Sequence, residues 1–247
     1  MSSSLSIAGG VTSQPISQDK LARLTGLLYL SLLPTAGFGI MSAQSLLENG
    51  GSAAAAQIAA SRALLELGVL AGAVCAITWL VLGVLFYALF RSVSERACQL
   101  MLVMAVAGSV LILASLARRM DALSLVADSQ RLALGPDQVR ALVALAVRSS
   151  DNLMQVSMIF WGVWLLPLGF LVFRSGFLPK TLGVLLMLGV PFYVGSFVGG
   201  VLDPEYAKTL VAQVIGFGFG IPEILGELGT GLWLLVRGTG GKVVPSR

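Results

Sequence analysis

The sequence predicts an all-α, polytopic membrane protein: a bundle of six transmembrane helices with both termini in the cytoplasm. Of its 247 residues, 56% are hydrophobic and only 11% are charged, and the mean hydropathy is +0.90. A soluble domain carries about 25% charged residues, so this chain lacks the polar surface of an ordinary water-soluble protein. A disordered chain is also excluded, because it would be polar and rich in charge. The length allows several spans of about 20 apolar residues joined by short loops.

The elements follow from the apolar runs and the breaks between them. Residues 1–19 are rich in serine and glycine, and we expect a disordered N-terminal tail. The six-helix transmembrane domain then covers residues 20–237, and residues 238–247 form a C-terminal tail. The predicted spans are residues 21–43, 63–90, 97–117, 153–173, 178–202 and 214–236. A turn at Asn49-Gly50-Gly51-Ser52 separates the first two spans, and Arg118-Arg119 is expected to end the third.

The longest polar stretch, residues 118–152, lies between the third and fourth spans. Gly135-Pro136-Asp137 is a good helix start, with proline at the first helical position and an acid in the first turn. Val139, Val143 and Ala146 then recur at helical spacing. We therefore predict an amphipathic helix over about residues 136–150, which either lies at the membrane surface or extends the fourth span in line.

The distribution of basic residues predicts the orientation. On the side that holds both termini, nine lysines and arginines stand against two acidic residues, whereas the opposite loops hold seven of each. The short basic loops at 91–96 and 174–180 are therefore expected in the cytoplasm. We predict a multi-pass membrane protein with both termini in the cytoplasm, surrounded by membrane lipids. A membrane-protein partner or a homo-oligomer is left open, and no nucleic acid is expected, because no basic cluster with interleaved aromatic residues occurs.

Several kinds of chemistry are excluded by counting. The chain has no histidine, which removes His-ligated haem, His-containing zinc or copper sites, and a histidine general base. Its two cysteines, Cys75 and Cys98, lie in or beside apolar runs and are expected to act as small hydrophobic side chains. No Walker A, nucleophile elbow or His-Glu-x-x-His pattern occurs. We therefore predict no metal, no cofactor and no catalytic residue.

Two carboxyl groups fall near the middle of the sixth span. Glu223 and Glu227 are four residues apart, so they share one helix face. An ionised group at the centre of a span costs about 2.5–3.5 kcal/mol or more, so at least one of the two is expected to be protonated at neutral pH. The surrounding glycines and Pro222 fit either a kinked, closely packed helix or a broken helix that lines a cavity.

Three interpretations of this pair remain open. The side chains can bond across to neighbouring helices as structural contacts, they can form a proton or cation pathway, or Arg118 or Arg148 can reach inward to form a salt bridge. Four further aromatic residues fall near the middle of their spans and are expected to face the bundle interior: Trp79, Trp161, Trp164 and Tyr193. They either pack as an aromatic core or, together with Pro222, line a lipophilic pocket that has the two glutamates as its polar end.

Residues 160–186, FWGVWLLPLGFLVFRSGFLPKTLGVLL, resemble the bacterial integral-membrane family catalogued as domain of unknown function 4386. The family also shows an opening like residues 22–30, ARLTGLLYL, and a late Gly226-Glu227-Leu228 followed by Trp233-Leu234-Leu235. Within the resemblance, the Arg-Ser-Gly-Phe-Leu-Pro loop is the specific part. Glu66 departs from it, since a basic residue is expected there. The resemblance implies a multi-pass protein of a bacterium, and therefore of the bacterial cytoplasmic (inner) membrane, and supplies no activity.

Three hypotheses of function follow. The first is a small carrier or proton-coupled membrane protein that uses Glu223 and Glu227, which requires a water-accessible cavity reaching the sixth span. The second is a non-catalytic accessory subunit or lipid-binding scaffold of a larger membrane complex, which requires a large apolar face and a companion protein. The third, an enzyme acting on a lipid, ranks last because no second catalytic group is apparent.

Overall fold

The computed structural model describes residues 17–47, 54–129, 131–203 and 205–240. Within these ranges the α-helices are α1 (Gln18–Leu47), α2 (Ala54–Phe90), α3 (Glu95–Ala127), α4 (Pro136–Arg174), α5 (Lys180–Leu188), α6 (Val190–Leu202), α7 (Leu210–Ile215) and α8 (Ile221–Arg237). A 3-10 turn, η1 (Tyr206–Lys208), precedes α7, and a π-helical segment, η2 (Gly216–Gly220), joins α7 to α8. α1 begins inside the tail predicted over 1–19. The rest of that tail, the predicted turn at 49–52 and residues 241–247 lie outside the described residues.

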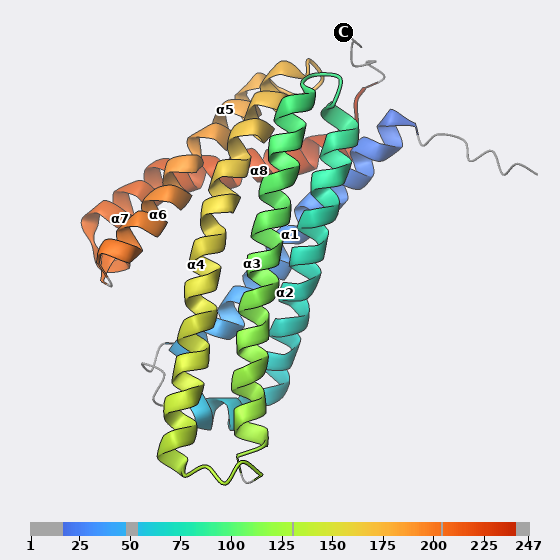
Figure 1. Cartoon of the computed structure of the whole chain (residues 1–247). Helices are drawn as coiled ribbons and strands as arrows, with labels where there is room; N and C mark the ends of the chain where they lie inside the picture. The colour runs from blue at the N-terminus through green and yellow to red at the C-terminus, as the bar shows by residue number, and fades with distance from the viewer. Residues whose placement is uncertain (1–16, 48–53, 130, 204, 241–247) are drawn as a thin grey trace, which may run out of the picture.

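Three long helices form the tallest part of the molecule (Figure 1). α2, α3 and α4 run side by side, α1 crosses them obliquely, and α5 to α8 lie beside one part of this bundle. The main core lies among α1 to α6 and α8, and large aromatic rings contribute much of it. Phe86 of α2, for example, packs edge-on against Tyr29 of α1 and Trp164 of α4, with ring centroids 5.4 Å and 5.8 Å apart.

Six helical segments are long and apolar enough to cross a membrane, which confirms the predicted number for the part of the chain that the structure describes. They are Gln18–Ile40, Arg62–Phe90, Glu95–Ala127, Pro136–Arg174, Lys180–Leu202 and Leu210–Arg237. The chain is therefore an all-helical, candidate multi-pass membrane protein. At about 1.5 Å per residue, the 33 residues of α3 and the 39 of α4 are each roughly 50–60 Å long, well beyond a hydrocarbon core of roughly 30 Å.

The third predicted span ends at Arg118-Arg119, but the helix does not, because α3 continues to Ala127. Arg119 does not stop the helix, since its side chain turns inward and the residue is only 8% exposed. It donates hydrogen bonds to the Gly39 carbonyl oxygen at 2.8 Å and to Ser150 Oγ at 3.1 Å. A buried, hydrogen-bonded arginine is compatible with a continuous helix between two neighbours.

Residues 136–150 do not form a separate interfacial helix. They are the first part of the continuous helix α4, which corresponds to the in-line alternative. Their apolar face is already covered by protein: Val143 is fully buried in a second core cluster with Ile58 of α2 and Ala122 of α3. No glycine or proline interrupts the polar Ser149-Ser150-Asp151-Asn152 stretch, so the helix passes through it.

The fifth and sixth candidate spans are irregular where the sequence carries proline. Gly189 separates α5 from α6, two residues before Pro191, whose missing N–H leaves one helical carbonyl without its usual donor. In the sixth, Pro222 follows the π-helical segment and cannot donate to the carbonyl of Gly218, four residues earlier. The regular α-helical hydrogen bonding of the sixth span is thus interrupted just before the two glutamates, which themselves lie in the regular helix α8.

The two described ends of the chain meet. Asp19, near the start of α1, accepts hydrogen bonds from the backbone N–H of Thr239 at 2.9 Å and from its hydroxyl at 2.7 Å. The loops α2–α3 and α4–α5 lie toward this end as well, and Trp233 Nε1 of α8 donates to the Phe177 carbonyl there at 3.0 Å. The two short basic loops and both described ends therefore share one end of the molecule (Figure 1).

Candidate functional site

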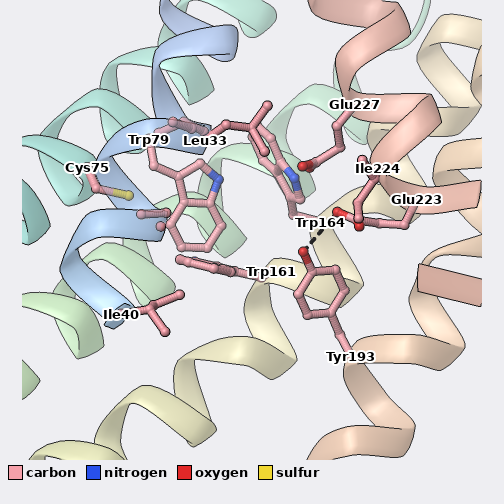
Figure 2. Close-up of a pocket in the computed structure, with 13 residues that line it drawn as sticks. Leu33, Ile40, Cys75, Trp79, Trp161, Trp164, Tyr193, Glu223, Ile224 and Glu227 are labelled. Carbon is pink, nitrogen blue, oxygen red and sulfur yellow. Dashed lines mark hydrogen bonds between the residues drawn. The ribbon is translucent and has the colours of Figure 1, made fainter. Parts of the chain in front are cut away.

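A cavity of about 250 Å³ lies among α1, α2, α4, α6 and α8. The two glutamates form its polar part, and Figure 2 shows both side chains approaching the same space as the tryptophans. The residues that line it are Leu32, Leu33, Ala36, Gly37, Ile40, Cys75, Trp79, Trp161, Trp164, Tyr193, Glu223, Ile224 and Glu227. Six of the seven residues singled out from the sequence thus meet at one cavity. The seventh, Pro222, is not among the lining residues.

Each glutamate is held by a tyrosine from a different helix. Tyr193 of α6 donates its hydroxyl to Glu223 Oε1 at 2.9 Å, and Tyr29 of α1 donates to Glu227 Oε1, also at 2.9 Å. Both tyrosines are buried, and Glu223 is only 4% exposed. These bonds tie α8 to α6 and to α1, so the pair does make contacts across helices. Each carboxyl group nevertheless keeps further lone pairs that the tyrosine does not use.

Two glycines, which have no side chain, make room for this arrangement. A Cβ atom on Gly189, at the break between α5 and α6, would lie 2.5 Å from Glu223 Cβ. A Cβ on Gly162 of α4 would lie 2.5 Å from Tyr193 Cβ. Both distances are far below an ordinary contact, so these glycines allow Glu223 and its tyrosine partner to approach α4 and α5.

The wall opposite the glutamates is aromatic. Trp79 lies with its ring centroid 5.7 Å from Trp161 and 5.7 Å from Trp164, at interplanar angles of 86° and 80°. Trp161 in turn meets Tyr193 at 6.4 Å and 79°. This edge-to-face arrangement presents ring faces as well as edges to the cavity. The indole N–H of Trp161 is buried and has no hydrogen-bond partner in the described structure.

The cavity reaches the protein surface through the side of the helix bundle. α1 and α8 are in close contact at one point, where a Cβ on Gly26 would lie 2.6 Å from the Gly231 carbonyl oxygen. Further along α1, Gly37 lines the cavity, and no atom lies within 4 Å of its Cβ position. Two lining residues on either side of this opening are exposed: Leu33 of α1 by 40% and Ile224 of α8 by 47%. The opening is therefore bordered by apolar side chains.

No basic side chain forms an ion pair with the glutamates in the described part of the chain, so the third of the open interpretations, a salt bridge from Arg118 or Arg148, is wrong. Arg118 pairs instead with Asp121 at 3.0 Å, and Arg148 is exposed. The buried cation near the cavity is Arg119, which lines a small adjoining space that shares Cys75 and Trp161 with the main cavity. Glu66 forms an exposed pair with Arg62 at 2.8 Å, away from the site.

Sequence reasoning missed two contributors to the site. One is Tyr29, which the sequence marks only through the resemblance, although a tyrosine inside an apolar span needs a partner for its hydroxyl and so indicates a buried acceptor. The α1 wall, including Leu33 and Ile40, carries no chemical signal at all, because these residues look like any lipid-facing aliphatic side chain. Among the described residues, no three His, Cys, Asp or Glu side chains come together as a metal site requires.

The arrangement defines a class: a helical, six-span candidate membrane protein with an acidic, aromatic cavity that opens through the side of its helix bundle. Residues 24–238 match the family described as a domain of unknown function (DUF4386), and the chain belongs to that family. A protein of Archaeoglobus fulgidus described as uncharacterized is 31% identical over 87 residues, which is 35% of this chain and 47% of that protein. The chain thus matches only about half the length of this archaeal relative. No solved structure matches the chain significantly.

Proposed function

We propose that the protein is a small proton-coupled carrier in which Glu223 and Glu227 hold and release a proton inside the membrane. The observation that carries this proposal is the cavity of about 250 Å³ that reaches both carboxyl groups. A pair with only a structural role would be enclosed by packed side chains, because protein interiors leave few voids larger than a water molecule.

The absence of a basic partner among the described residues favours a proton as the neutralising ion. The glutamates are held by tyrosine hydroxyl groups, which are neutral donors, and no described ion pair includes them. Two neighbouring carboxylates in a region of low dielectric constant repel one another, and binding one proton removes that repulsion. A site that gains and loses this proton changes its charge, which is the property that proton coupling needs.

The opening between α1 and α8 gives a ligand a route into the cavity from the side of the bundle. A lipid-binding scaffold is the second candidate function. It is favoured by the exposed apolar side chains of Leu33 and Ile224 at the edge of that opening. It predicts that a ligand binds without a change in the protonation of the glutamates.

Tryptophan fluorescence tests the proton-binding step. The chain has four tryptophans, and three of them line the cavity. In a Trp233→Phe background every remaining tryptophan therefore reports on the site. In lipid nanodiscs we expect one pH-dependent change in emission, which disappears in the double variant Glu223→Gln, Glu227→Gln and remains in the control Glu66→Gln. A transition that survives the double substitution would contradict the proposal.

The proposed setting is the bacterial cytoplasmic membrane, with both termini in the cytoplasm. Support comes from the basic loops 91–96 and 174–180, which lie toward the end of the molecule where the described ends of the chain meet. Reporter fusions at residue 1 and residue 247 test this orientation, since a cytoplasmic reporter is active in both fusions only when both termini are inside. Activity in one fusion alone would contradict it.

A further inference from the structure

We infer that the cavity binds a lipophilic organic cation, such as a quaternary or protonated amine, with its charged nitrogen beside Glu223 and Glu227 and its apolar part along the tryptophans. This inference names the ligand of the proposed carrier and therefore rests on the proposed function. Three features of the cavity carry it: the sign of its charge, the chemistry of its wall and its size.

The cavity has only acidic charge among its lining residues. Titratable groups reach it from four helices: Tyr29 of α1 through its bond to Glu227, Cys75 of α2, Tyr193 of α6, and the two glutamates of α8. α4 contributes uncharged tryptophans. The buried cation Arg119 of α3 lines the adjoining space and donates to Gly39 and Ser150. A cationic ligand would therefore meet carboxylates and no competing basic group.

The aromatic wall suits an organic cation rather than a metal ion. Positive nitrogen centres are attracted to the faces of tryptophan and tyrosine rings, and aromatic cages recognise quaternary ammonium groups in this way. The mutually perpendicular rings of Trp79, Trp161 and Trp164 offer such faces within one cavity. An alkali or divalent ion would instead need several oxygen ligands, and the described wall supplies few beyond the two carboxyl groups.

The size of the cavity limits the ligand. Sites for drug-sized molecules enclose about 300–1,000 Å³, whereas this cavity holds about 250 Å³. It therefore accommodates a small amine completely, or the head of a longer amphiphile whose tail leaves between Leu33 and Ile224. The net charge of the site is unchanged by binding, because the cation enters while one carboxylic acid loses its proton to water. The resulting carboxylate faces the nitrogen.

A pair of probes of the same shape tests this inference. Benzyltrimethylammonium and its neutral carbon isostere, neopentylbenzene, differ only in the charge at one centre. With full-length protein in nanodiscs and the Trp233→Phe background, we expect saturable quenching by the cation at a concentration at least about 30-fold below that of the isostere. In weakly buffered solution, close to one proton should be released for each cation bound. Glu227→Gln should abolish the release, and Glu66→Gln should leave it unchanged.

Measurements on the protein with both glutamates intact also test the inference, so the test does not depend on whether the Gln variants fold. If the cation displaces one proton, its affinity falls about tenfold for each pH unit on the acid side of the fluorescence transition. In proteoliposomes with an acidic lumen, the cation should accumulate inside while the pH gradient declines, relative to protein-free vesicles.

Different results overturn the two proposals separately. Equal or tighter binding of neopentylbenzene, with the Glu-dependent pH transition intact, overturns the organic-cation ligand and leaves the proton-coupled site standing. Loss of the Glu dependence from the pH transition overturns the proposed function and with it the exchange of cation for proton. Binding of the cation without proton release and without dependence on pH also overturns the inference.

Discussion

The contact between α4 and α5 gives the sharpest stability prediction, because the two backbones touch at paired glycines. A Cβ atom on Gly183 would lie 2.5 Å from the Gly169 carbonyl oxygen and 2.8 Å from the Phe173 nitrogen. Ordinary contacts are about 3.4–4 Å, and these neighbours are backbone atoms that cannot rotate away. Gly183→Ala must therefore move the helices apart by roughly 1 Å. Overpacking costs about 1–3 kcal/mol, and the higher helix propensity of alanine offsets up to about 1 kcal/mol.

The expected net loss is about 1–2 kcal/mol, which corresponds to a fall in Tm of roughly 2–8 °C for a chain of this size. The measurement is thermal unfolding in a mild detergent, followed by far-UV circular dichroism at one fixed scan rate. Gly37→Ala is the matched control, since it is also a glycine inside a helix and has no atom within 4 Å of its Cβ position. Adding Gly169→Ala to Gly183→Ala should cost less than the sum of the two, because the helices have already separated. Equal Tm values for Gly183→Ala and Gly37→Ala would refute the reasoning.

Two further substitutions test side chains that donate buried or partly buried hydrogen bonds, by the same unfolding measurement. Arg119→Lys should lower the free energy of unfolding by about 2–3 kcal/mol, because one ammonium cannot reproduce the guanidinium bonds to Gly39 and Ser150. The exposed neighbour provides its control, Arg118→Lys, and equal effects at the two positions would argue against the buried bonds. Trp233→Phe should cost about 1 kcal/mol through loss of the N–H donor to Phe177. Tyr87→Phe, which removes an exposed bond to Glu95, should have almost no effect, and a larger loss there than at Trp233 would contradict this ranking.

The sequence carries enough information to predict the number of spans and most polar residues of the cavity. Each span is a local property of an apolar run, and Glu223 and Glu227 stand out because carboxyl groups are costly inside such a run. Tryptophans in the middle of spans are similarly conspicuous, since their N–H groups need acceptors.

Contacts between distant segments could not be predicted in this way. Tyr29 and Glu227 are 198 positions apart, and nothing local to either residue identifies the other. Arg118 and Arg119 have identical side chains at adjacent positions, yet one is exposed and the other is buried. Which of them faces inward depends on the rotation of α3 against α1 and α4, a property of the packed bundle. The continuity of α4 depends on the same packing, because the buried Ser150 accepts a hydrogen bond from Arg119.

The sideways position of the opening between α1 and α8 changes how ligand concentration should be expressed. A compound that enters there arrives from the lipid phase, where apolar molecules accumulate far above their aqueous level. Occupancy of the cavity would then follow the mole fraction of the compound in the bilayer. At a fixed total amount of compound, doubling the quantity of lipid would dilute it and lower occupancy, although its nominal concentration in the sample is unchanged.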